Sequence, residues 1–402
     1  MAEVKLTYEW GDGVYTLLSW FKKEKVKNAR VLVAGAGALG NEVVKNLALF
    51  GVGHIYVVDF DQIEISNLTR SVLFRESDAM AHSYKAEVVA RRAMEINPQI
   101  KVTPIVGNLF SEVGFGLYRS VDVVIGCLDS RIARYQLNRL CMRAGKTWID
   151  GSIENLTGAV RVYAPGVCCY ECGLSREEFN NIMLRTGCAD VVRTQGKEGR
   201  VATTPISASI VGALQVQEAM KVIHQDDNAP TPFKTLQGKM MRYEGMTNSM
   251  NIYKFASWKS TCPAHEQWDN IEKGEGLSAS LTIQETMEQV KSLLAVTEVE
   301  LNMRNNKFID VIATDHPQKE FEVMVPESKL DAYIKANKEL RQLSYKALIH
   351  KHFFENIGER FPYMNLTLQE IGFPPYDVVE VTTEKGVYHV ELTNDAHLYD
   401  ID

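Results

Sequence analysis

One glycine-rich stretch limits what this chain can fold into more than any other feature. The sequence Val-Leu-Val-Ala-Gly-Ala-Gly-Ala-Leu-Gly occupies positions 31–40, and Val-Val-Asp-Phe-Asp follows at 57–61. The spacing predicts a buried strand, a tight turn that opens a helix, and a second strand that ends in a carboxylate. Gly35, Gly37 and Gly40 would let the backbone approach a phosphate, which the start of the helix also attracts. The stretch predicts a nucleotide site, although such glycines alone are also typical of nicotinamide cofactors.

Length, charge and composition narrow the class of protein. The chain has 402 residues, 45% of them hydrophobic, and a formal charge of -7. This favours two or three domains and argues against a general nucleic-acid binder. No apolar run reaches the length of a membrane span, and the first residues contain no apolar signal region. Seven cysteines at uneven spacing favour metal and thiol chemistry in a reducing compartment. We expect a cytoplasmic protein that binds neither nucleic acid nor membrane.

Short β-rich runs alternate with helical stretches from residue 30 to about 150. The runs predict strands at 30–35, 54–59, 101–107, 122–127 and 147–150, and helices at 39–51, 83–96 and 131–144. This alternation predicts an α/β fold, a doubly wound and mostly parallel sheet with helices on both faces. Residues 1–29 form a lead-in, for which one helix over Tyr15–Lys22 is predicted.

The first large domain continues to residue 265. After a predicted strand at Ala159–Tyr163, a polar stretch at 175–203 forms a crossover segment; such long polar segments within a domain are usually functional or disordered. Thr204 and Pro205 supply an N-cap and a first helical proline for a helix over Ile206–His224. Strands are expected again through 236–256.

Residues 278–402 are predicted to form a separate α+β domain, since the composition becomes more charged after His265. Val378–Thr383 and Val387–Leu392 flank a Glu-Lys-Gly turn. Two β-rich runs separated in this way predict a hairpin.

Polar side chains after the second strand distinguish the site from that of a dehydrogenase. They are Asp59, Asp61, Asn67, Arg70 and Lys85. Asp59 is placed to accept hydrogen bonds from ribose hydroxyls, with a solvated turn carboxylate as the alternative. An amide and two cations favour chemistry on a triphosphate, because Arg and Lys stabilise charge on a leaving phosphate.

Asp129 follows the apolar strand at 122–127. A carboxylate at the end of a strand is suited to hold Mg²⁺. The alternative is an N-cap for the helix that begins at Arg131, and both roles are compatible.

Two pairs of soft ligands make a second constellation. Cys169 and Cys172 form one pair, and Cys262 and His265 form the other about ninety residues later. Two such pairs can close a tetrahedral zinc site that ties distant segments together. Cys168 is a possible alternate ligand, but its side chain should point away. The alternative is two unlinked pairs of ordinary residues.

The remaining cysteines differ in their surroundings. Cys127 and Cys141 lie in apolar segments, which predicts buried core residues. Cys188 follows a glycine in the polar stretch, with Arg185 and Arg193 nearby. Because cations favour the thiolate, Cys188 is the candidate nucleophile for thioester chemistry. The alternative is an exposed cysteine without a catalytic role.

The ordered set of motifs resembles the adenylation domain of the ubiquitin-activating enzyme family, which includes the ThiF, MoeB and HesA adenylyltransferases. The matching motifs are Gly-x-Gly-x-x-Gly, Asp-Phe-Asp, Ser-Asn-x-x-Arg, Lys85, Ile-Asn-Pro and Cys-Leu-Asp, within roughly residues 28–265. The resemblance implies that the C-terminal carboxylate of a ubiquitin-like protein attacks the α-phosphorus of ATP. It assigns Asp59 to the ribose, Asp129 to magnesium, and Asn67, Arg70 and Lys85 to the phosphates.

The pattern Cys-Tyr-Glu-Cys followed by Gly-Cys resembles the catalytic subunit of SUMO-activating enzymes. This resemblance implies that Cys188 accepts the ubiquitin-like protein, which ends in glycine, as a thioester for a conjugating enzyme. The family has Cys-x-x-Cys pairs at both zinc positions, so His265 replaces the last thiolate here. The cofactors implied are ATP, Mg²⁺ and Zn²⁺.

Residues 278–402 occupy the place where activating enzymes carry a ubiquitin-fold domain that recruits the conjugating enzyme. An accessory or dimerisation module is the alternative. Family subunits often carry an arginine near the N-terminus that reaches a nucleotide across a dimer, and here no arginine precedes Arg30. We expect a dimer, either homo- or heteromeric.

Three other functions stay open at this point. The nearest is a sulfur-carrier adenylyltransferase of the MoeB and ThiF kind without a thioester step. A non-catalytic partner subunit of an activating-enzyme dimer would keep the fold as a scaffold. A nicotinamide oxidoreductase would need a hydride-handling His or Tyr constellation that the sequence does not reveal.

Overall fold

The computed structural model divides the chain into two compact units. Unit 1 consists of residues 1–109 and 118–267, and unit 2 of residues 110–117 and 268–402. The structure describes residues 9–11, 13–187, 202–225, 233–268, 270–304, 306–314, 319–342 and 348–401. In these ranges, no helix has both the length and the apolar character needed to cross a membrane.

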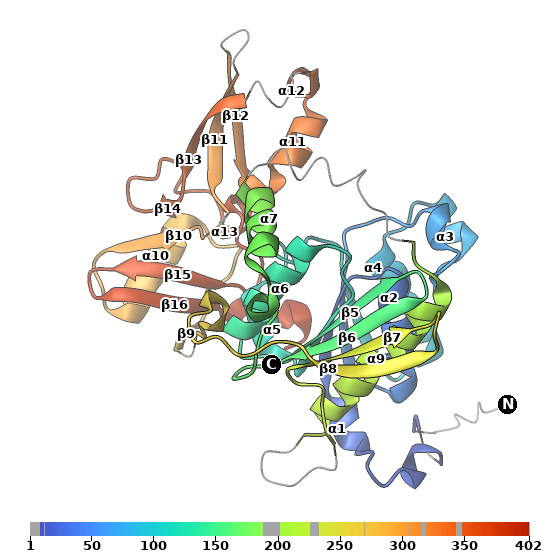
Figure 1. The fold of residues 1–402 in the computed structure, drawn as a ribbon. Helices are drawn as coiled ribbons and strands as arrows, with labels where there is room; N and C mark the ends of the chain where they lie inside the picture. The colour runs from blue at the N-terminus through green and yellow to red at the C-terminus, as the bar shows by residue number, and fades with distance from the viewer. Residues whose placement is uncertain are drawn as a thin grey trace, which may run out of the picture. The chain divides into compact units, whose positions relative to one another are not determined.

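Unit 1 is built on a sheet of eight described strands (Figure 1). The strands are β1 (Arg30–Ala34), β2 (His54–Val58), β3 (Lys101–Ile105), β4 (Val123–Gly126), β5 (Trp148–Glu154), β6 (Thr157–Tyr163), β7 (Lys239–Glu244) and β8 (Ser249–Lys254). They lie in the order β3-β2-β1-β4-β5-β6-β7-β8. The pairs from β3 to β5 are parallel, and those from β5 to β8 are antiparallel. The predicted doubly wound sheet is confirmed, with an antiparallel extension.

Helices cover both faces of this sheet. Among the described residues up to 267, the α-helices are α1 (Lys23–Asn28), α2 (Ala38–Phe50), α3 (Glu76–Met80), α4 (Lys85–Ile96), α5 (Phe115–Ser120), α6 (Arg131–Arg143), α7 (Arg176–Gly187) and α9 (Pro205–Ile223). One face, which includes Val33 and Ile149, forms a core with α2, α4 and α9. Trp148 points to the opposite face, since successive strand residues alternate. Its indole N–H donates to Asn138 of α6 at 3.3 Å.

The lead-in differs from its prediction. A 3₁₀ turn at Tyr15–Leu17 and then α1 replace the single helix expected over Tyr15–Lys22, because Lys22 has an extended backbone conformation. Phe21 stacks on Phe50 of α2 with ring centroids 6.1 Å apart. Such tertiary contacts outweigh the weak local preference for helix.

The predicted start of the long helix α9 is confirmed. The Thr204 hydroxyl accepts the backbone N–H of Ser207 at 3.2 Å, and Pro205 occupies the first helical position. Val211 and Val216 of α9 are buried in the core of unit 1. α9 (Pro205–Ile223) therefore packs against the sheet of unit 1.

In the described part of unit 2, five strands form a sheet in the order β14-β10-β15-β16-β9, and three form another in the order β12-β11-β13. Its strands are β9 (Ile271–Gly274), β10 (Val299–Asn302), β11 (Phe308–Thr314), β12 (Lys319–Pro326), β13 (Leu348–Phe354), β14 (Asn356–Ile357), β15 (Val378–Thr383) and β16 (Gly386–Leu392). Its helices after residue 268 are α10 (Ile283–Leu294), α11 (Leu330–Ala336), α12 (Lys338–Gln342) and α13 (Leu368–Ile371). β15 and β16 pair antiparallel, which confirms the predicted hairpin.

Glu384, in the turn of this hairpin, binds the chain that leads into β10. Its two carboxylate oxygens accept the backbone N–H groups of Thr297 at 2.8 Å and Glu298 at 3.0 Å. These hydrogen bonds lower the pKa of Glu384 to about 2. The carboxylate therefore holds two distant segments of unit 2 together while it is ionised.

Acid is expected to release this contact. Because the pKa of Glu384 is about 2 in the folded protein and its ordinary value is 4.5, the stabilisation is present above pH 4.5 and is lost as the pH falls toward 2. Hydrogen exchange should show the amides of Thr297 and Glu298 losing protection across this range. Glu384→Gln should lack that acid-dependent change, while the amides between β15 and β16 serve as the internal control. An unchanged acid response in Glu384→Gln would contradict this assignment.

Candidate functional site

The glycine stretch forms the predicted strand, turn and helix. Gly35 follows β1 with a φ of +99°, a left-handed conformation that glycine adopts without a Cβ penalty. Gly37 is the N-cap of α2, where no side chain caps the helix. The first amide N–H groups of a helix have no intrahelical partner and lie at the positive end of its dipole. The turn is therefore suited to an anion such as a phosphate.

The three glycines of the turn have different surroundings. A Cβ at Gly40 would lie 2.0 Å from the carbonyl oxygen of Gly35, and a Cβ at Gly35 would lie 2.6 Å from that of Cys127. A Cβ at Gly37 would meet no atom within 4 Å. Gly35 and Gly40 are required by packing, whereas Gly37 borders open space.

This difference predicts unequal effects of alanine. Gly40→Ala is expected to destabilise unit 1 by about 2 kcal/mol or more, because the obstructing atom belongs to the backbone and cannot rotate away. Gly37→Ala is the matched control and should cost about 1 kcal/mol or less. Denaturant unfolding without nucleotide measures both changes. Equal stabilities of the two variants would contradict the packing assignment.

Asn41, in the first turn of α2, fixes the glycine turn from inside. Its side-chain amide donates to the carbonyls of Ala36 at 2.9 Å and Gly37 at 3.0 Å. Its oxygen accepts the backbone N–H of Leu73 at 2.9 Å. Since Asn41 is fully buried, these bonds link the turn rigidly to the segment that follows Arg70.

Asp59 lies at the end of β2 and binds the same turn. One carboxylate oxygen accepts the N–H of Ala36 at 2.7 Å, and the other accepts the N–H of Asp61 at 2.8 Å. Burial raises the pKa of Asp59, and the charge of Lys85 opposes that shift. The structure thus places Asp59 beside the glycine turn, as the sequence predicts.

Lys85 begins α4 and reaches back toward the end of β2. Its Nζ lies 2.6 Å from Oδ2 of Asp61, and its backbone N–H donates to the Asp61 carbonyl at 2.9 Å. The side chain of Lys85 is 13% exposed and that of Asp61 is 52% exposed. Of the two carboxylates that follow β2, Asp59 therefore binds the glycine turn, and Asp61 pairs with Lys85.

Asn67 and Arg70 lie on and just after a 3₁₀ turn at Ile65–Asn67. The side-chain oxygen of Asn67 accepts the backbone N–H of Glu64 at 3.0 Å. The guanidinium of Arg70 donates to the carbonyl of Ser66 at 2.8 Å. Both side chains are partly exposed.

Asp129 lies beyond the carboxyl end of β4, two residues after Cys127, whose carbonyl faces Gly35. Its side chain is exposed. The N-cap of α6 is Ser130, whose hydroxyl accepts the N–H of Ala133 at 3.4 Å. The alternative that Asp129 caps this helix is therefore wrong.

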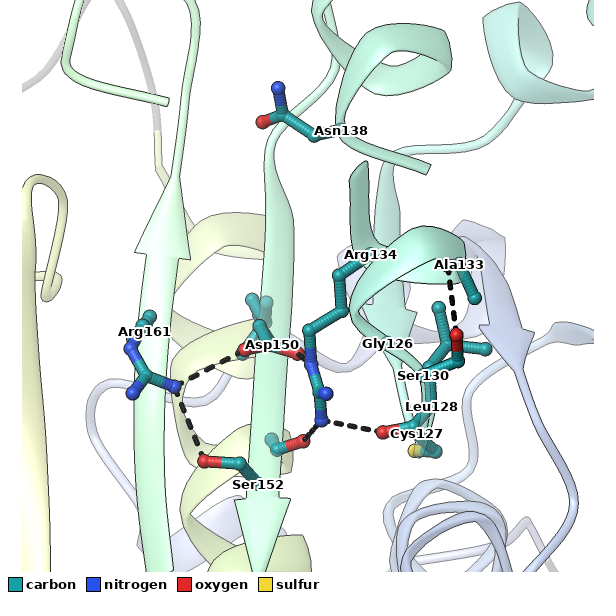
Figure 2. Close-up of polar contacts among 12 residues, drawn as sticks. Gly126, Cys127, Leu128, Ser130, Ala133, Arg134, Asn138, Asp150, Ser152 and Arg161 are labelled. Atoms are coloured by element: carbon teal, nitrogen blue, oxygen red, sulfur yellow. Dashed lines mark hydrogen bonds and ion pairs between the residues drawn. The ribbon is translucent and has the colours of Figure 1, made fainter. Parts of the chain in front are cut away.

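A cluster of charges joins the same loop to β5 and β6 (Figure 2). The Nε of Arg134 donates to Oδ1 of Asp150 at 2.7 Å, and its Nη2 donates to the carbonyls of Leu128 at 2.5 Å and Gly151 at 3.1 Å. The second oxygen of Asp150 accepts from Arg161 at 3.3 Å. Because Asp150 is fully buried, the ion pairs with these two arginines compensate the cost of removing its carboxylate from water.

The predicted nucleotide residues thus come from the carboxyl ends of β1, β2 and β4 and from the segments that follow them. The strand order reverses between β1 and β4. Open α/β sheets bind ligands in the crevice outside such a switch point. The site is therefore where the topology of the sheet predicts one.

The two predicted ligand pairs come together in one cluster. The ligand atoms of Cys169, Cys172, Cys262 and His265 all lie within 4.8 Å of one another. The sulfur of Cys169 is 3.7 Å from that of Cys262, and the sulfur of Cys172 is 3.3 Å from Nε2 of His265. Around a tetrahedral zinc with three sulfurs and one nitrogen, the ligand atoms are about 3.5 to 3.8 Å apart, given Zn–S and Zn–N bonds of about 2.3 and 2.0 Å. The donor set and the gathering of its four atoms therefore fit a single zinc ion.

Neighbouring side chains support this cluster. Arg139 of α6 donates to both carboxylate oxygens of Glu171, at 2.9 and 3.2 Å, and so holds the loop between the first two cysteines. The Trp258 ring stacks on that of His265 with centroids 5.2 Å apart. One contact supports the pair Cys169 and Cys172, and the other orients His265 of the second pair.

The other cysteines lie outside the cluster or outside the described residues. Cys188, the candidate nucleophile, falls in the range that the structure does not describe. Cys141 is buried and Cys127 is partly buried, 4.0 Å from the side-chain oxygen of Gln215, and burial raises the pKa of both thiols. Cys168 is buried and, as predicted, is not a member of the cluster.

Sequence reasoning missed three polar side chains that build this region. They are Asn41, Arg134 and Gln215, whose amide donates to the carbonyls of Gly126 at 2.9 Å and Ile149 at 3.2 Å. Each lies on a helix that packs against the sheet. A polar residue among the apolar positions of such a helix was the available signal.

Comparison with known proteins gives one family match and several partial matches to single proteins. The profile of the ThiF family matches residues 16–264. SUMO-activating enzyme subunit uba-2 of Caenorhabditis elegans is 37% identical over 157 residues, which are 38% of this chain and 27% of that protein. Molybdopterin-synthase adenylyltransferase of Salmonella typhimurium is 33% identical over 228 residues, which are 56% of this chain and 82% of that protein.

Among solved structures, a crystal structure of E. coli MccB with ATP has a TM-score of 0.48 and 25% sequence identity, covering 60% of this chain and 68% of that one. The matches of this chain cover between 27% and 61% of the length of four curated relatives, so the chain spans only part of these proteins.

Proposed function

The chain belongs to the ThiF family, and on that premise we propose that it is an ATP-dependent adenylyltransferase for the C-terminus of a ubiquitin-like or sulfur-carrier protein. The observation that carries this proposal is the bonded network at the switch point of the sheet. There the carboxylate of Asp59 binds the glycine turn, and Lys85 is held 2.6 Å from Asp61. A cation at this position suits chemistry on a triphosphate, because it stabilises charge on a leaving phosphate.

In the proposed reaction, a terminal carboxylate oxygen attacks the α-phosphorus of ATP. A carboxyl oxygen–phosphorus bond forms, and the bond to the leaving pyrophosphate breaks. Asp59 would accept from the ribose hydroxyls, while Asn67, Arg70 and Lys85 bind the phosphates. The two cations would offset the charge that grows on pyrophosphate.

Asp129 is proposed to hold Mg²⁺, because its exposed carboxylate, which follows the carboxyl end of β4, offers the oxygen ligand that this ion prefers. When bound, Mg²⁺ supplies further neutralisation of phosphate charge.

A structural zinc ion is proposed for Cys169, Cys172, Cys262 and His265. Four protein ligands leave no open position for a reactant, which separates structural from catalytic zinc sites. Its role would be to join two segments that are about ninety residues apart in the sequence.

At a finer level, we propose that Cys188 receives the activated protein as a thioester. The thiolate would attack the acyl carbon of the adenylate, so that a carbon–sulfur bond forms and AMP leaves. Similarity to a SUMO-activating enzyme subunit supports this step. Transfer to a conjugating enzyme would follow, and unit 2 is proposed to recruit that enzyme. A homo- or heterodimer is the proposed assembly.

A non-reducing gel tests the thioester. The protein is mixed with ATP, Mg²⁺ and candidate ubiquitin-like proteins that end in glycine. A thiol-sensitive adduct should form and should be absent in Cys188→Ala, while pyrophosphate exchange into ATP persists. An adduct that survives in Cys188→Ala would sink this choice of nucleophile.

A sulfur-carrier adenylyltransferase without a thioester step is the second candidate. It is favoured by the Salmonella adenylyltransferase, of which the chain covers 82%. This candidate predicts pyrophosphate exchange with no thiol-sensitive adduct. A non-catalytic partner subunit predicts no exchange with any such substrate.

A further inference from the structure

The loop that carries Asp129 is fixed on both sides of that residue. The carbonyl of Leu128 accepts from Arg134 at 2.5 Å, and Ser130 caps α6 through Ala133. Asp129 itself is exposed between these two fixed points. Its backbone direction is therefore set by its neighbours, and Arg134 is one of them.

Arg134 is itself held on several sides, as Figure 2 shows. Besides Leu128, its guanidinium binds Asp150 and the carbonyl of Gly151, and its side chain is only 12% exposed. Asp150 is in turn bound by Arg161 of β6. The loop is thus tied through one planar group to β5, and Asp150 extends this connection to Arg161 of β6.

A planar guanidinium is required for this arrangement. Arg134 binds the carboxylate through Nε and the two carbonyls through Nη2. The single nitrogen of a lysine cannot reproduce this fork, although it would keep the positive charge. Arg134→Lys therefore separates the geometry of the group from its charge.

We propose that Arg134 is a positioning residue that directs Asp129 toward Mg·ATP. It acts through the carbonyl of Leu128 and without touching the nucleotide. This role rests on the proposed adenylyltransferase function, and nothing in it requires Cys188.

The test is a double-mutant cycle on ATP binding by the full chain. Calorimetry measures the affinity for ATP in the presence of Mg²⁺ and in the presence of EDTA. Wild type should bind ATP more tightly with Mg²⁺. Arg134→Lys should lose roughly three- to tenfold of that metal-dependent gain and keep its metal-free affinity. In an Asp129→Asn background, Arg134→Lys should cause no further loss. Arg92→Lys, on α4 and in an ion pair with Glu95, is the control and should keep the full gain.

Two outcomes would overturn the proposal. They are an equal loss of affinity with and without Mg²⁺, and a loss that adds to that of Asp129→Asn. If Arg134→Lys does not fold, Asp150→Asn keeps the guanidinium and weakens its anchor. It should show a smaller loss of the same metal-dependent kind, and an unchanged gain in that variant would count against the proposal. Failure of the underlying function is distinct, since wild type would then show no pyrophosphate exchange with any substrate that ends in glycine.

Discussion

Lys85→Met is expected to lower the rate of pyrophosphate exchange into ATP by about 10²- to 10³-fold, the usual cost of removing one group that stabilises a transition state. The methionine keeps the apolar length of the side chain and removes only its charge. Asp61, the partner of Lys85, is 52% exposed, so its carboxylate stays solvated. The melting temperature should therefore change little.

Lys291→Met is the matched control for this substitution. Lys291 lies in unit 2 and makes an equally short pair of 2.6 Å with Glu359, which is 65% exposed. Its exchange rate should equal that of wild type, and Lys85→Arg should recover part of the lost activity. Exchange by Lys85→Met within threefold of wild type would remove Lys85 from the proposed phosphate site.

Loss of the proposed zinc ion is the second large effect. A strong chelator, or Cys172→Ala, is expected to destabilise unit 1 by about 3 kcal/mol or more, since metal binding contributes directly to folding free energy. For a unit of this size, that corresponds to a decrease in melting temperature of roughly 6–12 °C. Calorimetric melting and metal analysis of the same samples measure both quantities.

Cys168→Ala is the control, because Cys168 is a buried neighbour of the ligands that lies outside the cluster. It should retain one zinc per chain and lose only the stability that truncating a small buried side chain costs. Wild-type protein purified without metal, with a melting temperature that a chelator does not change, would contradict the zinc assignment.

The parts that sequence reasoning predicted correctly depend on local pattern. The glycine spacing and the alternation of β-rich and helical runs predicted β1, α2 and β2. The rule that ligands bind at the carboxyl ends of parallel strands then placed Asp59 at the turn. The cluster of Cys169, Cys172, Cys262 and His265 was accessible because each pair is a short-range motif.

The parts that were missed depend on contacts between distant segments. Arg134 binds the carbonyl of Leu128 in the loop after β4 and that of Gly151 in β5, and main-chain acceptors leave no trace in a sequence. Asn41 likewise bonds to Leu73, thirty-two positions away. The helix predicted over Tyr15–Lys22 was wrong for a similar reason. Phe21 packs on Phe50 of a distant helix, and the chain there is not helical. The alternative role of Asp129 as the N-cap of α6 was wrong, because the adjoining Ser130 also can cap a helix and does so here.

One further consequence follows from the polar groups around the glycine turn. Asp59 is bonded to Ala36, Lys85 to Asp61 and Arg70 to Ser66. A nucleotide that binds these groups would exchange one set of partners for another instead of gaining a new set. The affinity for nucleotide then reflects the difference between the contacts that these groups make with the nucleotide and those that they give up within the protein. Only that difference contributes to the free energy of binding.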